Sequence, residues 1–276
     1  MRIDAHQHFW KYDPAQYPWI KAGSPIHGDF LPPDLKPLLD HAKIDGCVAV
    51  QARQTLEESR WLLSLSARHP FIKGVVAWVD LRSETVREQL VELAHSPRFA
   101  GIRHVVQDEP ENDFMLGAAF LRGIERLKEF DLSYDILIYP RQLPAAIELA
   151  RRFPAQRFVL DHIAKPPIKE ATLSPWRDQI RELAKSTNVF CKISGMVTEA
   201  DLKKWKRDDF SPYLDVVFEA FGAPRLMYGS DWPVCLLAAR YEQVYDLAAG
   251  YCARLSAAEQ EMVFGGTAAK FYRLTV

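Results

Sequence analysis

Short apolar runs alternate with helical patterns eight times along these 276 residues, and this alternation constrains the fold more than any other feature. The runs are rich in Val, Ile and Phe, and nearly all of them are continuous, which is typical of strands buried on both faces. Strands that alternate with helices form parallel βαβ units. The predicted strands are residues 2–6, 47–51, 74–79, 101–105, 134–138, 158–161, 189–193 and 226–229.

Eight such units in a chain of this length favour a closed (β/α)8 TIM barrel, for which about 250 residues are typical. The alternative is an open doubly wound sheet, which typically carries a glycine-rich phosphate loop after its first strand, and this sequence has none there. Apolar residues are spaced for helices at 86–94, 116–127 and 214–221, and Ser256 begins a capping box. No linker interrupts the pattern, so we expect one α/β domain over residues 1–276.

One segment, residues 9–36, departs from the alternation. It contains several prolines, glycines and aromatic residues, so we expect a long loop after the first strand. Loops that follow barrel strands lie at the mouth of the barrel, where the active sites of this fold are found. We therefore expect this loop to cover the mouth, as part of the site, as packing over the barrel, or as both.

Composition argues against two classes of partner. A formal net charge of −1 provides neither a basic surface for nucleic acid nor a polybasic membrane anchor, and no stretch approaches the roughly 18 apolar residues of a membrane span. Residues 1–6 run directly into the first predicted strand without a signal peptide, and the four cysteines are scattered. We expect a cytoplasmic enzyme with reduced thiols that acts on a small molecule as a monomer or homodimer.

Residues with the chemistry of an active site follow the predicted strands. His6 and His8 form an H-x-H pair, and side chains at i and i+2 of a strand point to the same side. Asp161 and His162 end the sixth strand, and Asp231 ends the eighth. Strands 1 and 8 are neighbours in a closed barrel, so we expect these histidines and Asp231 to meet around a divalent metal or an activated water. The alternative for the H-x-H pair taken alone is a strand cap made through ordinary hydrogen bonds, and the alternative for Asp231 taken alone is a helix cap or turn residue.

Further candidates lie near the ends of other predicted strands. Sugar hydroxyls require fixed polar groups and often an aromatic surface. His104 is a candidate catalytic residue beside Arg103, and because neighbouring strand residues alternate, we expect only one of the two to face inward fully. The alternative for this pair is a salt bridge at the rim. The substrate-binding candidates are Arg103, Trp10, Gln51, Trp78, Tyr139 and Trp232.

Six segments spread over essentially the whole chain carry a family resemblance. They are RIDAHQHFW at 2–10, GIRH and QDEP within 101–110, VLDH and KP within 159–166, KISG at 192–195, MYGSDWP at 227–233 and GTAAKFY at 266–272. With them the sequence resembles the amidohydrolase superfamily, in its branch of sugar lactonases that includes L-fuconolactonases and L-rhamnonolactonases. The first and last strand motifs mark the superfamily, and QDEP and KISG point to the lactonase branch.

The resemblance implies a metal site. In the superfamily, the strand-1 histidine pair, histidines on strands 5 and 6 and the strand-8 aspartate surround the metal. The matching residues here are His6, His8, His162 and Asp231, whereas the strand-5 histidine and a strand-4 lysine that can be carboxylated are missing. The resemblance therefore implies one divalent metal, with zinc as the first choice, that is weakly held or dispensable.

The implied reaction is hydrolysis of a sugar lactone, with L-fuconolactone or a close stereochemical relative as the substrate. Such acyl transfer needs a base for the water, a positive group at the carbonyl oxygen and an acid for the leaving alkoxide. Asp231 is assigned the roles of base for the water and acid for the leaving alkoxide. His162, with Arg103 or His104, is assigned the stabilisation of the carbonyl oxygen.

Two other functions remain open at this point. Pyrone-dicarboxylate lactonases and aromatic acid decarboxylases share the barrel and the strand-8 aspartate, but a dicarboxylate substrate calls for several inward arginines, and only Arg53, Arg103 and Arg141 follow strands here. A non-catalytic binding barrel is the second alternative, and it would have lost Asp231, which is present in its full motif. The sequence therefore favours a neutral sugar lactone.

Overall fold

The eight strands form one parallel sheet whose order follows the sequence, in a computed structural model that describes residues 1–275. The sheet closes on itself, because the backbone N–H of Asp231 donates to the carbonyl of His6 (2.8 Å) and the N–H of His8 donates to the carbonyl of Trp232 (2.7 Å). The predicted (β/α)8 barrel is thus confirmed. The strands are β1 (Ile3–Gln7), β2 (Gly46–Val50), β3 (Ile72–Ala77), β4 (Phe99–His104), β5 (Ser133–Ile136), β6 (Phe158–Leu160), β7 (Val189–Ile193) and β8 (Leu226–Tyr228).

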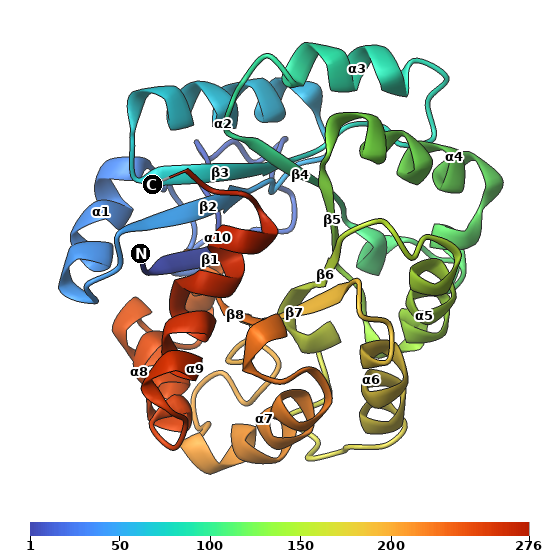
Figure 1. Cartoon of the computed structure of the whole chain (residues 1–276). Coiled ribbons are helices and arrows are strands. Elements are labelled where there is room, and N and C mark those ends of the chain that lie inside the picture. The colour runs from blue at the N-terminus through green and yellow to red at the C-terminus, as the bar shows by residue number, and fades with distance from the viewer. Residues whose placement is uncertain (276) are drawn as a thin grey trace.

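Helices surround the barrel, as Figure 1 shows, and the three stretches whose apolar spacing predicted helices, 86–94, 116–127 and 214–221, each overlap one of them. Ser256 begins the capping box of α9, since its Oγ accepts from the backbone N–H of Glu259. The helices are α1 (Pro32–His41), α2 (Leu56–Arg68), α3 (Val86–Leu93), α4 (Ala118–Arg126), α5 (Leu143–Arg152), α6 (Trp176–Ala184), α7 (Arg207–Phe221), α8 (Tyr241–Cys252), α9 (Ala257–Glu261) and α10 (Thr267–Phe271). Among these helices, none is both long and apolar enough to cross a membrane.

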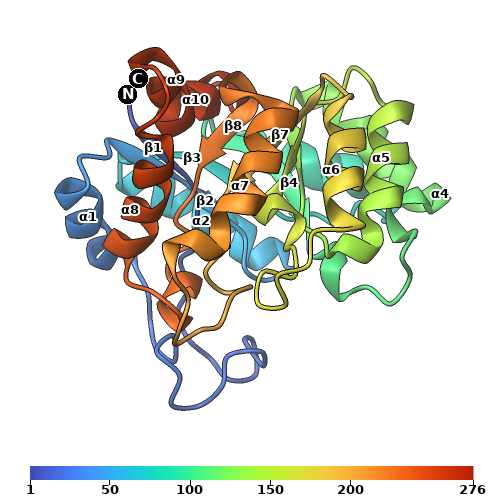
Figure 2. The same ribbon diagram turned by 90° about the horizontal axis from the view of Figure 1, so that it is seen from below.

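The barrel interior changes character from its floor to its mouth. At the floor, inward residues such as Ile3, Val48 and Met227 pack against Phe271 and Tyr272 at the end of the chain. Figure 2 shows α10 and both termini at this end of the barrel and the long loop after β1 at the other. The apolar floor supports the polar groups above it, which lie toward the carboxyl ends of the strands.

The long loop after β1 lies at the mouth, but it is shorter than predicted. The helix α1 already begins at Pro32, whereas the sequence pattern placed residues up to 36 in the loop. Proline is well tolerated at the first positions of a helix, where its missing N–H has no helical partner, so the prolines there start α1 rather than prevent it. Trp10 and Phe30 exchange two backbone hydrogen bonds (3.0 and 2.9 Å), which ties the two arms of the loop together.

Candidate metal centre

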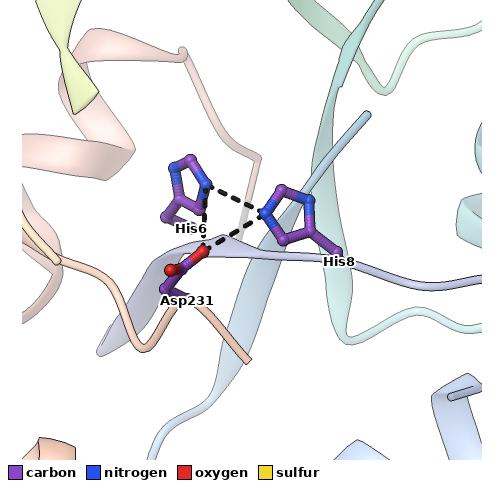
Figure 3. A group of neighbouring side chains, drawn as sticks. All are labelled: His6, His8 and Asp231. Atoms are coloured by element: carbon purple, nitrogen blue, oxygen red, sulfur yellow. Dashed lines mark hydrogen bonds and ion pairs between the residues drawn. The ribbon is translucent and has the colours of Figure 1, made fainter. Parts of the chain in front are cut away.

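Three side chains face one another at the carboxyl ends of β1 and β8 (Figure 3). The Nε2 atoms of His6 and His8 are 3.2 Å apart, and Asp231 Oδ1 lies 3.3 Å from His8 Nε2 and 3.7 Å from His6 Nε2. His162 Nε2 lies 3.9 Å from the same Asp231 oxygen. All four side chains are buried. The structure therefore brings together the four residues that the sequence pattern assigned to one site.

The spacing of these atoms fits a tetrahedral metal ion. Ligands about 2.0–2.1 Å from zinc stand roughly 3.3–3.4 Å apart at the tetrahedral angle, and the three distances within the His6, His8 and Asp231 group are 3.2, 3.3 and 3.7 Å. His8 Nδ1 lies 2.8 Å from the carbonyl oxygen of Val50. A carbonyl only accepts, so Nδ1 carries a proton and Nε2 is the nitrogen that faces the site.

A left-handed turn places His162 in the site. The four residues from His162 to Lys165 all have positive φ, from 48° to 59°, and none of them is glycine. Left-handed backbone costs roughly 1–2 kcal/mol per residue of this kind, so the surrounding structure must hold the turn. Gly195 lies against the imidazole, and a Cβ there would stand 2.4 Å from His162 Nδ1. His162 Nδ1 lies 2.9 Å from Ser194 Oγ, which fixes the direction of Nε2.

A buried network of charges lies beneath the metal centre. Lys192 Nζ is 2.6 Å from Asp135 Oδ2, 3.0 Å from Asp161 Oδ1 and 3.1 Å from His6 Nδ1. Arg103 Nη1 is 3.2 Å from Asp161 Oδ2. Each member comes from a different strand or strand end, and all are buried. The network therefore fixes His6 from behind and holds Arg103 beside it, with Nη1 3.3 Å from His6 Nε2.

A second set of potential ligands, His6, Asp161 and His162, is not suited to another cation. Burial alone would raise the pKa of Asp161, but Lys192 and His6 hold it well below its usual value. Both oxygens of this carboxylate are already paired with side-chain cations, Oδ1 with Lys192 and Oδ2 with Arg103, whereas Asp231 has no Lys or Arg ion pair among the described residues. The geometry therefore favours one ion rather than two.

The charges at the site of His6, His8 and Asp231 suit both a bound metal and a catalytic base. Burial alone would raise the pKa of Asp231, but His162 and His8 hold it below its usual value. Burial lowers the pKa of His6 and of His162 well below the usual range. At neutral pH the site therefore offers a carboxylate and neutral imidazoles, which are the forms that bind divalent metals.

A cavity of about 730 Å³ opens above this group. Of the predicted site residues, His8, Trp10, Arg103, His162 and Asp231 line it, while His6 lies beneath with no exposed surface. The long loop forms one wall. The lining residues that the sequence pattern did not assign include Gln16, Trp19, Arg53, Gln107, Asp108, Lys165 and Glu199.

His104 lies apart from this cavity. Its ring stacks on Phe114 (5.0 Å between centroids), on the helical side of the sheet, and its Nε2 lies 2.7 Å from Glu109 Oε1. Strand alternation explains this, because Arg103 takes the inward position and His104 must point outward. The pairing is with Glu109 at the rim, so we assign His104 no catalytic role.

Four substrate-binding candidates also lie outside the cavity lining. Gln51 supports Arg103 instead, since its Oε1 accepts from Nη2 at 2.8 Å. Trp232 is buried against Phe30, with ring centroids 5.4 Å apart. Tyr139 lines a neighbouring groove, and Trp78 lines none of the described pockets. Each was selected because it lies near the end of a predicted strand, and this position does not decide on which side of the barrel wall a side chain lies.

Lys192 and Asp135 are site residues that the sequence reasoning did not single out as such. Both interrupt otherwise apolar strands, Lys192 in VFCKI and Asp135 in SYDI. An ionisable residue within a continuous buried strand requires a partner. Two such residues of opposite sign are the signal that would have revealed the network.

Comparisons with known proteins agree with this geometry. Residues 3–274 match the amidohydrolase family. The chain is 43% identical to the L-fucono-1,5-lactonase of Burkholderia multivorans and 39% identical to that of Burkholderia ambifaria, in each case over 99% of this chain and 96% of the relative. A crystal structure of an amidohydrolase from Burkholderia multivorans with bound Zn is 43% identical, with a TM-score of 0.96 over the full length of both chains. The chain belongs to the amidohydrolase family.

Proposed function

We propose that this protein hydrolyses a sugar lactone to the aldonic acid, with L-fucono-1,5-lactone as the first substrate to test. The observation that carries the proposal is the buried, ionised Asp231, which lies between two imidazoles at the base of a 730 Å³ cavity. Two relatives named as L-fucono-1,5-lactonases, 43% and 39% identical over almost the whole chain, support the choice of substrate.

His6, His8 and Asp231 would hold one divalent metal, and zinc is the ion that we propose, since it is bound in the similar Burkholderia multivorans structure. When bound, such an ion lowers the pKa of a water and polarises a carbonyl. The missing strand-5 histidine leaves the ion with fewer protein ligands, so we propose that it is held weakly. His162 lies close enough to join the ligands or to contact the substrate.

Asp231 is the proposed base. Its ion-pair contacts within residues 1–275 are all made through Oδ1, so Oδ2 is left to accept the proton of the attacking water. The water oxygen bonds to the lactone carbonyl carbon, the bond from that carbon to the ring oxygen breaks, and Asp231 returns its proton to the ring oxygen. His162 and Arg103 line the cavity and stabilise the negative charge on the carbonyl oxygen.

A dicarboxylate substrate is less compatible with the cavity. Of the three arginines near the ends of strands, Arg53 and Arg103 line it, and Arg103 is already paired with Asp161. The guanidinium of Arg141 donates instead to the carbonyl oxygens of Gln107 and Glu109. Among residues 1–275, the ion pair of the lining residue Arg53 is with the exposed Glu57 (3.8 Å) rather than with a buried carboxylate, so one arginine is available to a substrate and a neutral lactone fits better.

Asp231→Asn tests the proposal. Asparagine has nearly the same shape but cannot accept the proton, so we expect turnover of L-fucono-1,5-lactone to fall about 10²–10⁴-fold, mainly in kcat. Acid release is followed with a pH indicator, and circular dichroism and zinc content are measured in parallel. Asp201→Asn, at an exposed turn, is the control. Near-wild-type turnover by a folded Asp231→Asn protein would show that the water is activated elsewhere.

A further inference from the structure

Two residues form a wall between the catalytic cavity and a second space. A groove of about 360 Å³ lies beside the 730 Å³ cavity, and Lys165 and Glu199 are the residues that line both. Their side chains meet there, with Lys165 Nζ 3.6 Å from Glu199 Oε1. The ion pair therefore stands at the boundary of the space that is open to a substrate.

The wall consists of side chains on an anchored backbone. Lys165 ends the left-handed turn that also carries His162, and its ammonium lies 5.4 Å from the ring centroid of Tyr139. Glu199 is fixed by its main chain, because its carbonyl accepts from the N–H of Lys169 (3.0 Å) and its N–H donates to Met196 (3.1 Å). Shortening the two side chains would join the two spaces without removing these backbone contacts.

We infer that the Lys165–Glu199 ion pair sets the upper size of the lactone, so that the enzyme accepts a single sugar ring and rejects one with a bulky substituent. The inference rests on the proposed function and concerns the same site. The groove behind the pair is lined by aromatic and proline rings, by the hydroxyl-bearing Thr172 and Ser174 and by one further acidic residue, Glu170. This lining suits an uncharged ring, which the ion pair keeps out of the wild-type enzyme.

Size must be separated from charge, because Lys165 also acts on Asp231 electrostatically. Lys165→Ala/Glu199→Ala removes both the wall and its charges. Lys165→Met/Glu199→Gln removes the charges but keeps side chains of similar length. Arg181→Ala/Glu219→Ala removes an ion pair between the outer helices α6 and α7 and is the matched control.

The substrates are L-fucono-1,5-lactone and its three mono-O-benzyl ethers at C2, C3 and C4. The quantity compared is the ratio of kcat/KM for each ether to that for the parent lactone. We expect the double-alanine protein to raise this ratio about tenfold or more for at least one ether. The Met/Gln protein and the control should keep the wild-type ratios, whatever their absolute rates.

Binding of the corresponding 1,5-lactams, which do not require turnover, gives a second readout by calorimetry. Unchanged ratios in the double-alanine protein, or wild-type enzyme that accepts the ethers as readily as the parent, would overturn the inference. Failure of the wild type to open the parent lactone would instead contradict the proposed function, and the lactam ratios would still decide the role of the pair. Glu199→Ala alone replaces the double variant if that protein does not fold.

Discussion

At the scale of the residue, His162 depends on a glycine that faces its ring. Gly195 has φ +60°, and a Cβ there would stand 2.4 Å from His162 Nδ1. We expect Gly195→Ala to displace the imidazole and lower kcat/KM for the lactone about 10²-fold, because charge stabilisation at the carbonyl oxygen is lost. The measurement is steady-state hydrolysis.

Gly222→Ala is the control for backbone strain. Gly222 has a similar φ of +66°, but the nearest atom to an added Cβ is 3.6 Å away, on Pro224. Both substitutions should lower the melting temperature, and only Gly195→Ala should lower the rate strongly. Equal losses of activity would mean that strain, rather than contact with His162, explains the effect.

The direction of some site side chains could be predicted from the sequence, and that of others could not. The H-x-H spacing sufficed to place His6 and His8 on one side, because side-chain direction on a strand follows from alternation. Alternation also predicted that one of Arg103 and His104 faces inward, but it could not say which. The turn that carries His162 was not predictable, since left-handed backbone is locally unfavourable and exists only where tertiary contacts hold it.

At the scale of the element, a buried carboxylate joins the long loop to α2. Glu58 Oε2 accepts from the backbone N–H groups of Ala52 (3.0 Å) and Arg53 (2.7 Å), and its Oε1 accepts from the hydroxyl of Tyr17 in the loop (3.3 Å). Burial raises the pKa of Glu58 from 4.5 to about 7. Between these pH values the folded protein binds one proton more than the unfolded chain.

The contribution of Glu58 to stability should therefore fall as the pH rises from 4.5 to 7. The stability that the protonated Glu58 contributes is fully present below pH 4.5 and is lost as the pH rises through 7. A pKa raised from 4.5 to about 7 corresponds to about 3 kcal/mol of unfolding free energy. Glu58→Gln does not titrate, so we expect the free energy of unfolding of the variant minus that of wild type to increase by up to this amount over the range. Urea denaturation at several pH values measures it, and a constant difference would contradict the prediction.

Strand positions were predictable because parallel buried strands are continuous apolar runs. The ionisable residues within them were harder to interpret. Lys192 and Asp135 are far apart in sequence, and their charges compensate each other only when β5 and β7 lie in one barrel. The start of α1 was misplaced because Pro32 signals both a loop and a first helical turn. Only the residues that follow Pro32 decide whether it lies in a loop or in the first turn of a helix.

At the scale of the whole molecule, the proposed metal lies at the seam where the barrel closes. His6 and His8 belong to β1, and Asp231 follows β8, so one ion would connect the two edges of the sheet. The seam also contains the backbone bonds from Asp231 and His8, and the N–H of Ser230 donates to Asp4 Oδ1 (2.9 Å) across it. Zinc at about 100 times its dissociation constant should add about 2.7 kcal/mol, or roughly 5 °C in melting temperature.

Chelation should reverse this shift and reduce lactone hydrolysis only partly, because the imidazoles and Arg103 remain in place. Hydrogen exchange should increase in β1 and β8 and remain unchanged in β4 and β5, which lie across the barrel and serve as the internal control. Asp231→Asn should show a much smaller zinc-dependent shift. Uniform exchange changes throughout the barrel would contradict a role for the ion at the seam.

The buried charges extend from the metal centre to the closed end of the barrel. Lys192 links His6 to Asp135, and Asp135 Oδ2 accepts from the hydroxyl of Tyr272 (2.7 Å), which follows α10 at the floor. Selection experiments that randomise only the mouth would miss this connection. A library that seeks faster or altered variants should therefore include Tyr272 and its neighbours, because a substitution there acts on the position of His6 from the side that the substrate never enters.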